Sequence, residues 1–334
     1  MARKPIGHER VAAMTGVNPN WLMRFVRDHP EVRKLTAGAE TPHLAGAIDV
    51  HVHADPCSLI PRAQSYTEVA IECANAGMRA VVRKDHSYST VGEAVAIQRH
   101  VDHLVESGRL ANRIEVYGGI PTRFGRGPEL VRDALRTGML KEIWMNPVGG
   151  VPLVESTRVY PEVLDLIKLA AERGIGLNLG PPNHSLAYAG IDDYDGLAPL
   201  VDAVAKIGCV ACLDHPLSSY DVDEIDRLTP PGVYAGLFCF PSLPSIIKGP
   251  LADPQETLDL VRRIGAGRCI VASDVGTMLE PSTMESLRLM IRFLLGLGLP
   301  GPAVDQMLKV NPAKLIGLST PSLADEASFP RAAE

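Results

Sequence analysis

The chain has 334 residues, of which 46% are hydrophobic and 22% are charged. This balance excludes a mainly disordered chain and leaves enough apolar surface for a large core. The formal net charge is −6 and no basic run occurs, so we expect no nucleic-acid partner. Six cysteines in so long a chain do not indicate a disulfide framework. No apolar run suits a signal segment or a membrane span, and we therefore expect a cytoplasmic protein without a membrane partner.

Residues 1–45 are polar and mixed, with one amphipathic helix expected near Trp21, and are predicted to form an N-terminal extension. After them, short apolar or β-branched runs alternate with longer segments of helical periodicity. The eight short runs are predicted strands: 47–53, 79–86, 114–121, 142–148, 175–180, 209–215, 232–240 and 269–276. The predicted helices are 66–77, 91–107, 127–138, 158–173, 195–207, 221–228, 254–264 and 282–297, with a last one at 303–318.

Eight strand–helix pairs predict a parallel sheet, and residues 47–299 span close to the ~250 positions typical of a (β/α)₈ TIM barrel. An open doubly wound sheet would carry a glycine-rich phosphate loop after its first strand, where this chain reads HVHADPCS. The prediction is therefore an α/β fold with a barrel at 46–318 and a loose C-terminal tail at 319–334.

Histidines gather at the ends of the predicted strands, which is where the active sites of such barrels lie. The alternation of a strand places Asp49, His51 and His53 on the inner face, with Ile48, Val50 and Val52 facing the helices. Two imidazoles on one rigid strand can hold a metal ion together with a carboxylate from elsewhere in the barrel.

With this pair, the sequence resembles the amidohydrolase superfamily of metal-dependent hydrolases. The motifs that carry the resemblance are AIDVHVHADP (47–56), LDHP (213–216), ASDVGT (272–277) and NPAKLIGL (311–318). The stretch GMRAVVRKDHSYST (77–90) and the segments IEVYGGI and WMNPVGG are closer still to an uncharacterised amidohydrolase-like branch. The resemblance implies a distorted barrel with one or two divalent ions and a metal-activated water as nucleophile.

Residue by residue, the resemblance implies that His51 and His53 are the first-strand ligands and that His215 is the sixth-strand ligand. Asp274 becomes the eighth-strand aspartate, which binds metal and moves the proton. His184, a few residues past the fifth strand, takes the place of the fifth-strand histidine.

The fourth strand departs from the family pattern, in which a carboxylated lysine or a glutamate often bridges two ions. It offers only Asn146 at its end, because Lys141 and Glu142 are predicted to precede the strand. The second strand instead supplies Lys84 and His86 on one face. Lys84 either carries a carbamate across two ions or stays cationic and holds an anionic substrate. His86 is either a ligand of the second ion or a general acid.

Substrate contacts are expected from Arg123, Arg126 and Asn146, since a cation there can bind a carboxylate or phosphate; the alternative is a pair of solvated loop arginines. The sequence thus predicts a hydrolase of a small-molecule amide, cyclic amide or ester, with Asp274 as general base. Zn²⁺ is the expected cofactor, as one or two ions, with Mn²⁺ or Fe²⁺ also suitable. The alternatives are a metal-dependent decarboxylase or other lyase, and a non-catalytic binding barrel. Barrels of this kind often associate, so a homo-oligomer is expected.

Overall fold

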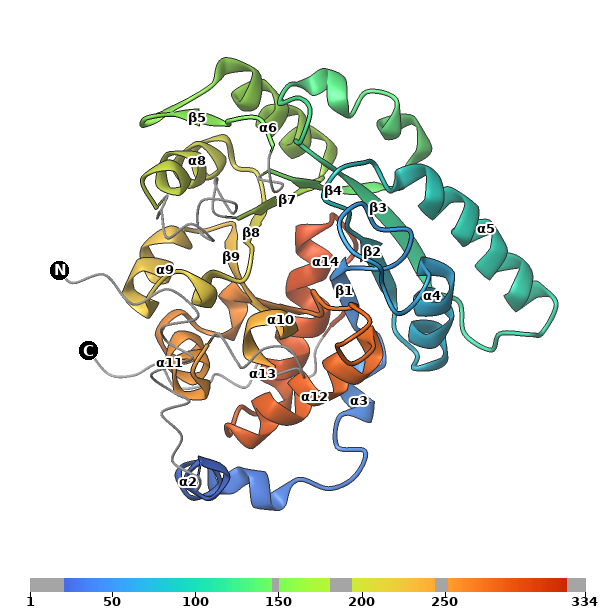
Figure 1. The fold of residues 1–334 in the computed structure, drawn as a ribbon, viewed down its shortest axis with the longest axis vertical. Coiled ribbons are helices and arrows are strands. Elements are labelled where there is room, and N and C mark those ends of the chain that lie inside the picture. The colour runs from blue at the N-terminus through green and yellow to red at the C-terminus, as the bar shows by residue number, and fades with distance from the viewer. Residues whose placement is uncertain (1–20, 146–149, 181–193, 244–251, 323–334) are drawn as a thin grey trace.

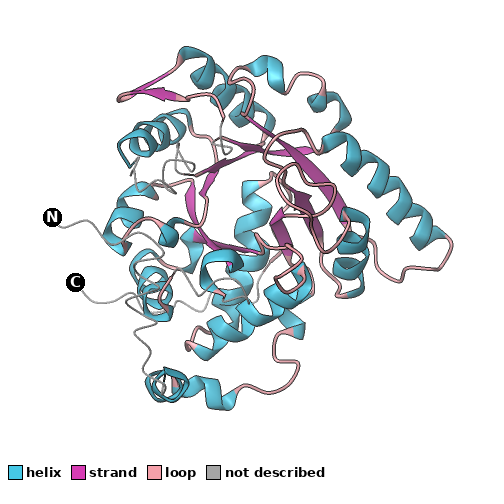
Figure 2. Ribbon diagram, viewed as in Figure 1, coloured by secondary structure: helices cyan, strands magenta, loops and turns pink. Residues whose placement is uncertain are grey.

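The computed structural model describes residues 21–145, 150–180, 194–243 and 252–322 of the chain. At its centre, eight parallel strands curve into a ring (Figures 1 and 2). In sheet order they are β1 (Ile48–Val52), β2 (Ala80–Arg83), β3 (Glu115–Pro121), β4 (Leu140–Trp144), β7 (Gly176–Leu179), β8 (Ala211–Leu213), β9 (Val233–Phe238) and β10 (Cys269–Ala272). The ring closes where the backbone N–H of Asp274, just after β10, donates to the carbonyl of His51 at 2.9 Å. The predicted (β/α)₈ barrel is confirmed, and each of the eight predicted strands overlaps an observed one.

Helices follow most strands and surround the ring (Figure 2). They are α4 (Tyr66–Asn75), α5 (Val91–Glu106), α6 (Pro161–Arg173), α8 (Tyr194–Ile207), α9 (Val222–Leu228), α11 (Pro254–Ile264) and α12 (Thr283–Gly296). Capping boxes begin α4, α9 and α11, where Ser65, Asp221 and Asp253 each accept from a backbone N–H while a glutamate at the third helical position bonds back. These caps set the residue at which the chain turns from the barrel mouth into each helix.

The predicted helix at 127–138 is wrong as a regular α-helix. Two 3₁₀ turns, Pro128–Leu130 and Ala134–Thr137, occupy the segment, with bonds such as Arg136 N to Asp133 O that close over three residues. Gly138 ends the second turn with a φ of 72°, a left-handed conformation that glycine adopts without strain. A short hairpin that the sequence analysis did not predict, β5 (Val154–Glu155) and β6 (Arg158–Val159), precedes α6.

The ends of the described chain pack against the barrel. α2 (Trp21–Asp28), a 3₁₀ helix (Pro30–Lys34) and α3 (Thr41–Leu44) lie beside α12. The predicted final helix is instead three consecutive pieces: α13 (Gly301–Asp305), a π-helical turn (Gln306–Val310) and α14 (Asn311–Leu315). Outside the barrel, α10 (Cys239–Ser242) follows β9 directly. None of the described helices is long and apolar enough to cross a membrane.

The inner face of β1 differs from the simple alternation. Ile48 and Val50 pack in a cluster that takes side chains from six barrel strands and α14, which places them inside the ring. Val52 packs with the helices, as predicted. The pairing of β1 with β2 shifts register between Asp49 and Val52, and this irregularity reorients the strand. Because of it, the prediction that Ile48 and Val50 face the helices is wrong, while His51 still reaches the centre.

Candidate metal centre

Two imidazoles and a carboxylate converge at the ends of β1 and β10. Nε2 of His51 lies 3.3 Å from Oδ1 of Asp274, and Nε2 of His53 lies 3.2 Å from the same oxygen. All three side chains are buried. Residues more than 220 positions apart in sequence therefore meet at one point, as the sequence analysis predicted.

A second group shares Asp274 and adds two neighbours from the end of β8. Nε2 of His215 lies 3.7 Å from Oδ2 of Asp274 and 3.8 Å from Oδ1 of Asp214. Ligand atoms of Asp214, His215 and Asp274 lie within 4.8 Å of one another, as do those of His51, His53 and Asp274. Asp214 was missed by the sequence analysis, although it directly precedes His215 in the LDHP motif.

The backbone at these ligands is strained. His215 has a φ of 31° and Asp274 a φ of 47°, and both lie in the left-handed region that non-glycine residues seldom occupy. Such conformations cost of order 1–3 kcal/mol each and persist where surrounding structure holds them, commonly at functional sites. Here the strain turns both side chains towards the centre of the barrel mouth.

Buried atoms in this group fit a divalent metal. Nε2 of His51, Nδ1 of His53 and Oδ1 of Asp214 are buried without a hydrogen-bond partner, although such atoms are costly to bury unpaired. Burial lowers the pKa of His53 to about 3, so its imidazole is neutral at pH 7. Burial opposes ionisation of Asp274, yet the facing His51 holds the pKa of that carboxyl well below its usual range. Neutral imidazoles and ionised carboxylates are the states that bind metal.

Lys84 and His86 lie at the edge of this group. Nζ of Lys84 is 3.3 Å from Oδ2 of Asp214, and both side chains are almost fully buried. The ring of His86 stacks on that of His53, with centroids 5.0 Å apart and planes 18° apart. Burial and the nearby Lys84 ammonium lower the pKa of His86. Of the two alternatives for Lys84, the ion pair with Asp214 favours a cation that balances the carboxylates.

Two polar contacts at Nδ1 orient the imidazoles of His51 and His215. Nδ2 of Asn178, on β7, lies 3.5 Å from Nδ1 of His51. Oγ of Ser218 lies 2.9 Å from Nδ1 of His215. Partners of this kind fix the ring orientation of metal-binding histidines.

The position of Glu142 differs from the prediction for the fourth strand. β4 is Leu140–Trp144, so Lys141 and Glu142 lie within the strand rather than before it. The Glu142 side chain is fully buried and neither carboxyl oxygen has a partner among the described residues. Burial raises its pKa well above the ordinary value despite the nearby Lys84. The interior of the barrel therefore holds a buried carboxyl group that the sequence analysis did not place there.

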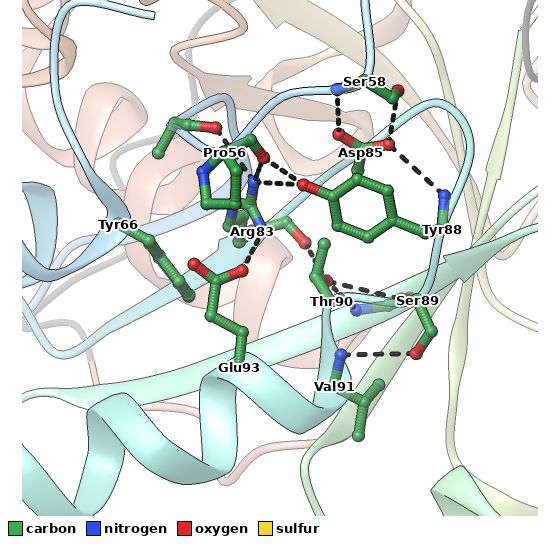
Figure 3. A network of polar contacts seen from close by, with 12 residues as sticks. Pro56, Ser58, Tyr66, Arg83, Asp85, Tyr88, Ser89, Thr90, Val91 and Glu93 are labelled. Carbon is green, nitrogen blue, oxygen red and sulfur yellow. Dashed lines mark hydrogen bonds and ion pairs between the residues drawn. The ribbon is translucent and has the colours of Figure 1, made fainter.

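A polar network at the end of β2 holds the loop that follows β1 (Figure 3). The fully buried Arg83 guanidinium donates to the carbonyls of Ala54 and Pro56 and pairs with Glu93. Asp85 accepts from Oγ of Ser58 at 2.7 Å. Arg83 and Asp85 hold this loop by hydrogen bonds, and Lys84 between them faces Asp214 of the candidate metal centre. The end of β2 therefore contacts both the loop and the centre.

The contacts of the remaining predicted site residues are with other parts of the protein or lie outside the described residues. Arg126 donates to the carbonyl of Pro152 at 2.8 Å and lies over the ring of Tyr160. Arg123 lies 5.5 Å from the centroid of the Phe124 ring. Asn146 and His184 lie outside the described residues, so their predicted roles stay predictions.

Cavities on the described surface include one of about 490 Å³, which is lined by residues of β6, α6 and α8 and by none of the residues of the candidate metal centre. Another, about 630 Å³, is lined by the loop after β1, including Pro56, Cys57 and Ile60. We regard the second as the relevant one, because Arg83 and Asp85 hold its lining loop at the barrel mouth.

Comparison with known proteins gives one family and a shared fold. A family model described as "Family of unknown function (DUF6282)" matches residues 46–235. None of the curated proteins matches the sequence.

Several solved structures share the fold at low identity. Dihydroorotase from Saccharomyces cerevisiae is 13% identical, with a TM-score of 0.55 over 83% of this chain and 85% of that chain. An amidohydrolase from Pseudomonas aeruginosa is 11% identical, with a TM-score of 0.54 over 84% of this chain and 100% of that one. Dihydroorotase from Campylobacter jejuni is 11% identical, with a TM-score of 0.53 over 83% and 85%. These likenesses confirm the predicted resemblance to the amidohydrolase superfamily at the level of the fold.

Proposed function

The chain belongs to the Family of unknown function (DUF6282), since the family model spans more than half of it, and we propose that it is a metal-dependent hydrolase of small-molecule amides, cyclic amides or esters. One observation carries the proposal: His51, His53 and Asp274 meet at the barrel mouth with buried, unpartnered imidazole nitrogens. That dihydroorotases and an amidohydrolase share the fold supports it.

The residues that would hold a cation are His51, His53, Asp214, His215 and Asp274. When bound there, a divalent ion supplies Lewis acidity to the scissile group and lowers the pKa of water towards ~7. Zinc suits a set rich in imidazole, and manganese or iron are the other candidates.

The chain's own groups then handle the proton and the charge. Asp274, held ionised, accepts the proton from the nucleophilic water and returns it to the leaving group. His86, which is kept neutral beside His53, is the second group able to carry a proton there. Lys84 balances Asp214, so the mouth does not accumulate an excess of negative charge.

Metal content is the first test. The purified protein is expected to hold one or two ions per chain by elemental analysis, and the double variant His51→Ala, His53→Ala is expected to lose them. His100, an exposed histidine of α5, gives the matched control His100→Ala, which should keep the metal. Equal metal content in all three proteins would overturn the proposal.

Turnover is the second test. The metal-loaded protein is assayed against a panel of cyclic imides, hydantoins, N-acyl amino acids and aryl esters in H₂¹⁸O. Hydrolysis incorporates ¹⁸O into the product, and turnover should stop with a chelator and in the His51→Ala, His53→Ala double variant. Release of CO₂ without ¹⁸O incorporation would replace the hydrolase by a decarboxylase.

A further inference from the structure

Arg62 lies in the loop after β1 and is buried, with 7% of its surface exposed. Its backbone N–H donates to Oδ1 of Asp55 at 3.0 Å, and its Nε donates to Sγ of Cys57 at 3.3 Å. Neither of its Nη atoms has a hydrogen bond or ion pair with any described residue. The guanidinium is largely buried without a counter-ion among the described residues, which is unfavourable, and its Nη atoms keep enough exposure for an anion to reach them.

The loop places Arg62 at the metal ligands. Arg62 pairs with Thr277 as an antiparallel bridge, and the N–H of Ala63 donates to the carbonyl of Gly276 at 2.9 Å. Gly276 itself packs so closely on the carbonyl of His53 that a Cβ there would lie 2.6 Å from that oxygen. Arg62 is thus held between the strand end that carries His53 and the strand end that carries Asp274. The guanidinium is close enough to contribute to the lowered pKa of His53, after the larger effect of burial.

Other cations near the mouth are already engaged. Lys84 faces Asp214, Arg83 pairs with Glu93, and Arg126 donates to the Pro152 carbonyl. Two acids lie within seven positions of Arg62 in sequence. Asp55 accepts from the backbone of Arg62 rather than from the guanidinium, and Glu68 accepts from Ser65. Lys84 and Arg83 thus each face a carboxylate and Arg126 bonds a carbonyl, whereas the Arg62 guanidinium pairs with no acid of the described residues.

We propose that Arg62 binds a carboxylate of the substrate, so that the enzyme acts on amides or esters that carry one carboxylate close to the scissile bond. The inference rests on the proposed function, because it places that substrate at the same centre. A planar guanidinium binds a carboxylate through two parallel hydrogen bonds, which fixes direction as well as charge. One unmatched cation balances one monoanion, which favours a carboxylate over a dianionic phosphate.

The loop that carries Arg62 is preorganised by hydrogen bonds to the rest of the protein. Bonds from Arg83 to Pro56 and from Ser58 to Asp85 fix its first half, and the Ala63–Gly276 bond fixes its second half. A positioned arginine loses little freedom on binding, so its contribution to affinity is retained. Arg62 is thus proposed as a carboxylate contact, while the substrate contacts expected of Arg123 and Arg126 stay predictions.

Binding of matched ligand pairs tests the inference without requiring turnover. The probes are succinamate, glutaramate and adipamate, each compared by calorimetry with its neutral diamide on the metal-loaded protein. At least one monocarboxylate is expected to bind about 10- to 100-fold more tightly than its diamide. This preference should disappear in Arg62→Met and be partly kept in Arg62→Lys, which retains charge without the fork. Arg113→Met, an exposed arginine paired with Asp102, should keep the full preference.

The outcomes separate this inference from the proposed function. Wild-type protein that binds every diamide as tightly as its monocarboxylate overturns the role of Arg62, even where metal and turnover are confirmed. An unchanged carboxylate preference in Arg62→Met overturns it as well. If Arg62→Met does not fold, the wild-type comparison still decides. A preference lost in Arg62→Met while no substrate of the panel is hydrolysed keeps the carboxylate site and rejects the hydrolase.

Discussion

Replacement of Arg83 by methionine tests whether the network behind the barrel mouth stabilises the fold. The Arg83 side chain is fully buried and its partner Glu93 is 26% exposed. The guanidinium also lies 5.9 Å from the ring centroid of Tyr66 and 5.7 Å from that of Tyr88. Methionine fills much of the volume but leaves Glu93 and the carbonyl of Ala54 without their donor, while the carbonyl of Pro56 keeps its bond from Tyr88.

Removing one partner of a buried ion pair typically costs 3–5 kcal/mol, because the other charge stays buried and unpaired. We therefore expect Arg83→Met to lower the free energy of unfolding by about 3–5 kcal/mol, measured by urea denaturation at pH 7. Arg113→Met is the matched control, since Arg113 makes a 2.8 Å ion pair with Asp102 but is 53% exposed. An exposed pair is worth about 0–1 kcal/mol, so this control should change little.

A double variant isolates the pair from the packing. Arg83→Met with Glu93→Gln removes the orphaned charge and should recover part of the loss, a coupling of about 0.5–3 kcal/mol. The reasoning would be refuted if Arg83→Met and Arg113→Met differed by less than about 1 kcal/mol, or if the double variant recovered nothing.

Three further predictions concern single carboxyl groups. Asp214→Asn should reduce bound metal and turnover while keeping the fold. Unchanged metal content by elemental analysis would contradict a role of Asp214 as a ligand. Glu40 accepts two bonds from Arg292, at 2.9 and 3.0 Å, which lower the pKa of Glu40. Wild type should therefore exceed Glu40→Gln in unfolding free energy by about 1 kcal/mol above pH 5, and the difference should vanish as pH falls through the lowered pKa. A pH-independent difference would count against it. Burial raises the pKa of Glu142, so its folded state binds more protons than its unfolded state above pH ~4.3, and wild type should lose stability relative to Glu142→Gln as pH rises from 5 to 8. Parallel stability profiles for the two proteins would refute this.

The sequence predicted the barrel and much of its centre because both follow from local pattern. Eight apolar runs separated by helical segments define the strands, and the chemistry of a parallel barrel gathers at their carboxyl ends. His51, His53, His215 and Asp274 each end such a run, so the resemblance could place them individually. The structure brings all four together.

What the sequence could not supply is the outcome of backbone irregularity and of long-range pairing. The register shift in β1 breaks the alternation of the strand, so Ile48 and Val50 face inward although His51 reaches the centre too, and no two-residue periodicity encodes this. β4 begins at Leu140, two residues earlier than its apolar run suggests, which moves Glu142 into the barrel. Asp214 was passed over because the histidine beside it fitted the metal pattern better. Its own signal, a carboxylate at the same strand end, was available.

The role of Arg62 could not be predicted from the sequence for a different reason. It depends on the absence of an acidic partner near the guanidinium in the described part of the chain, which only the folded structure shows. In sequence it is one arginine in a loop of prolines and serines, and arginines of that kind are commonly solvated. Only the fold reveals that the loop pairs with the segment after β10 and that the largely buried guanidinium has no acid partner among the described residues. A metal centre can be predicted by collecting residues of one chemistry, because ligands recur as recognisable types at strand ends. A substrate contact such as Arg62 is identified by a side-chain charge that has no counter-ion in the fold. Such a charge can be recognised only after each neighbouring carboxylate has been assigned to its own partner.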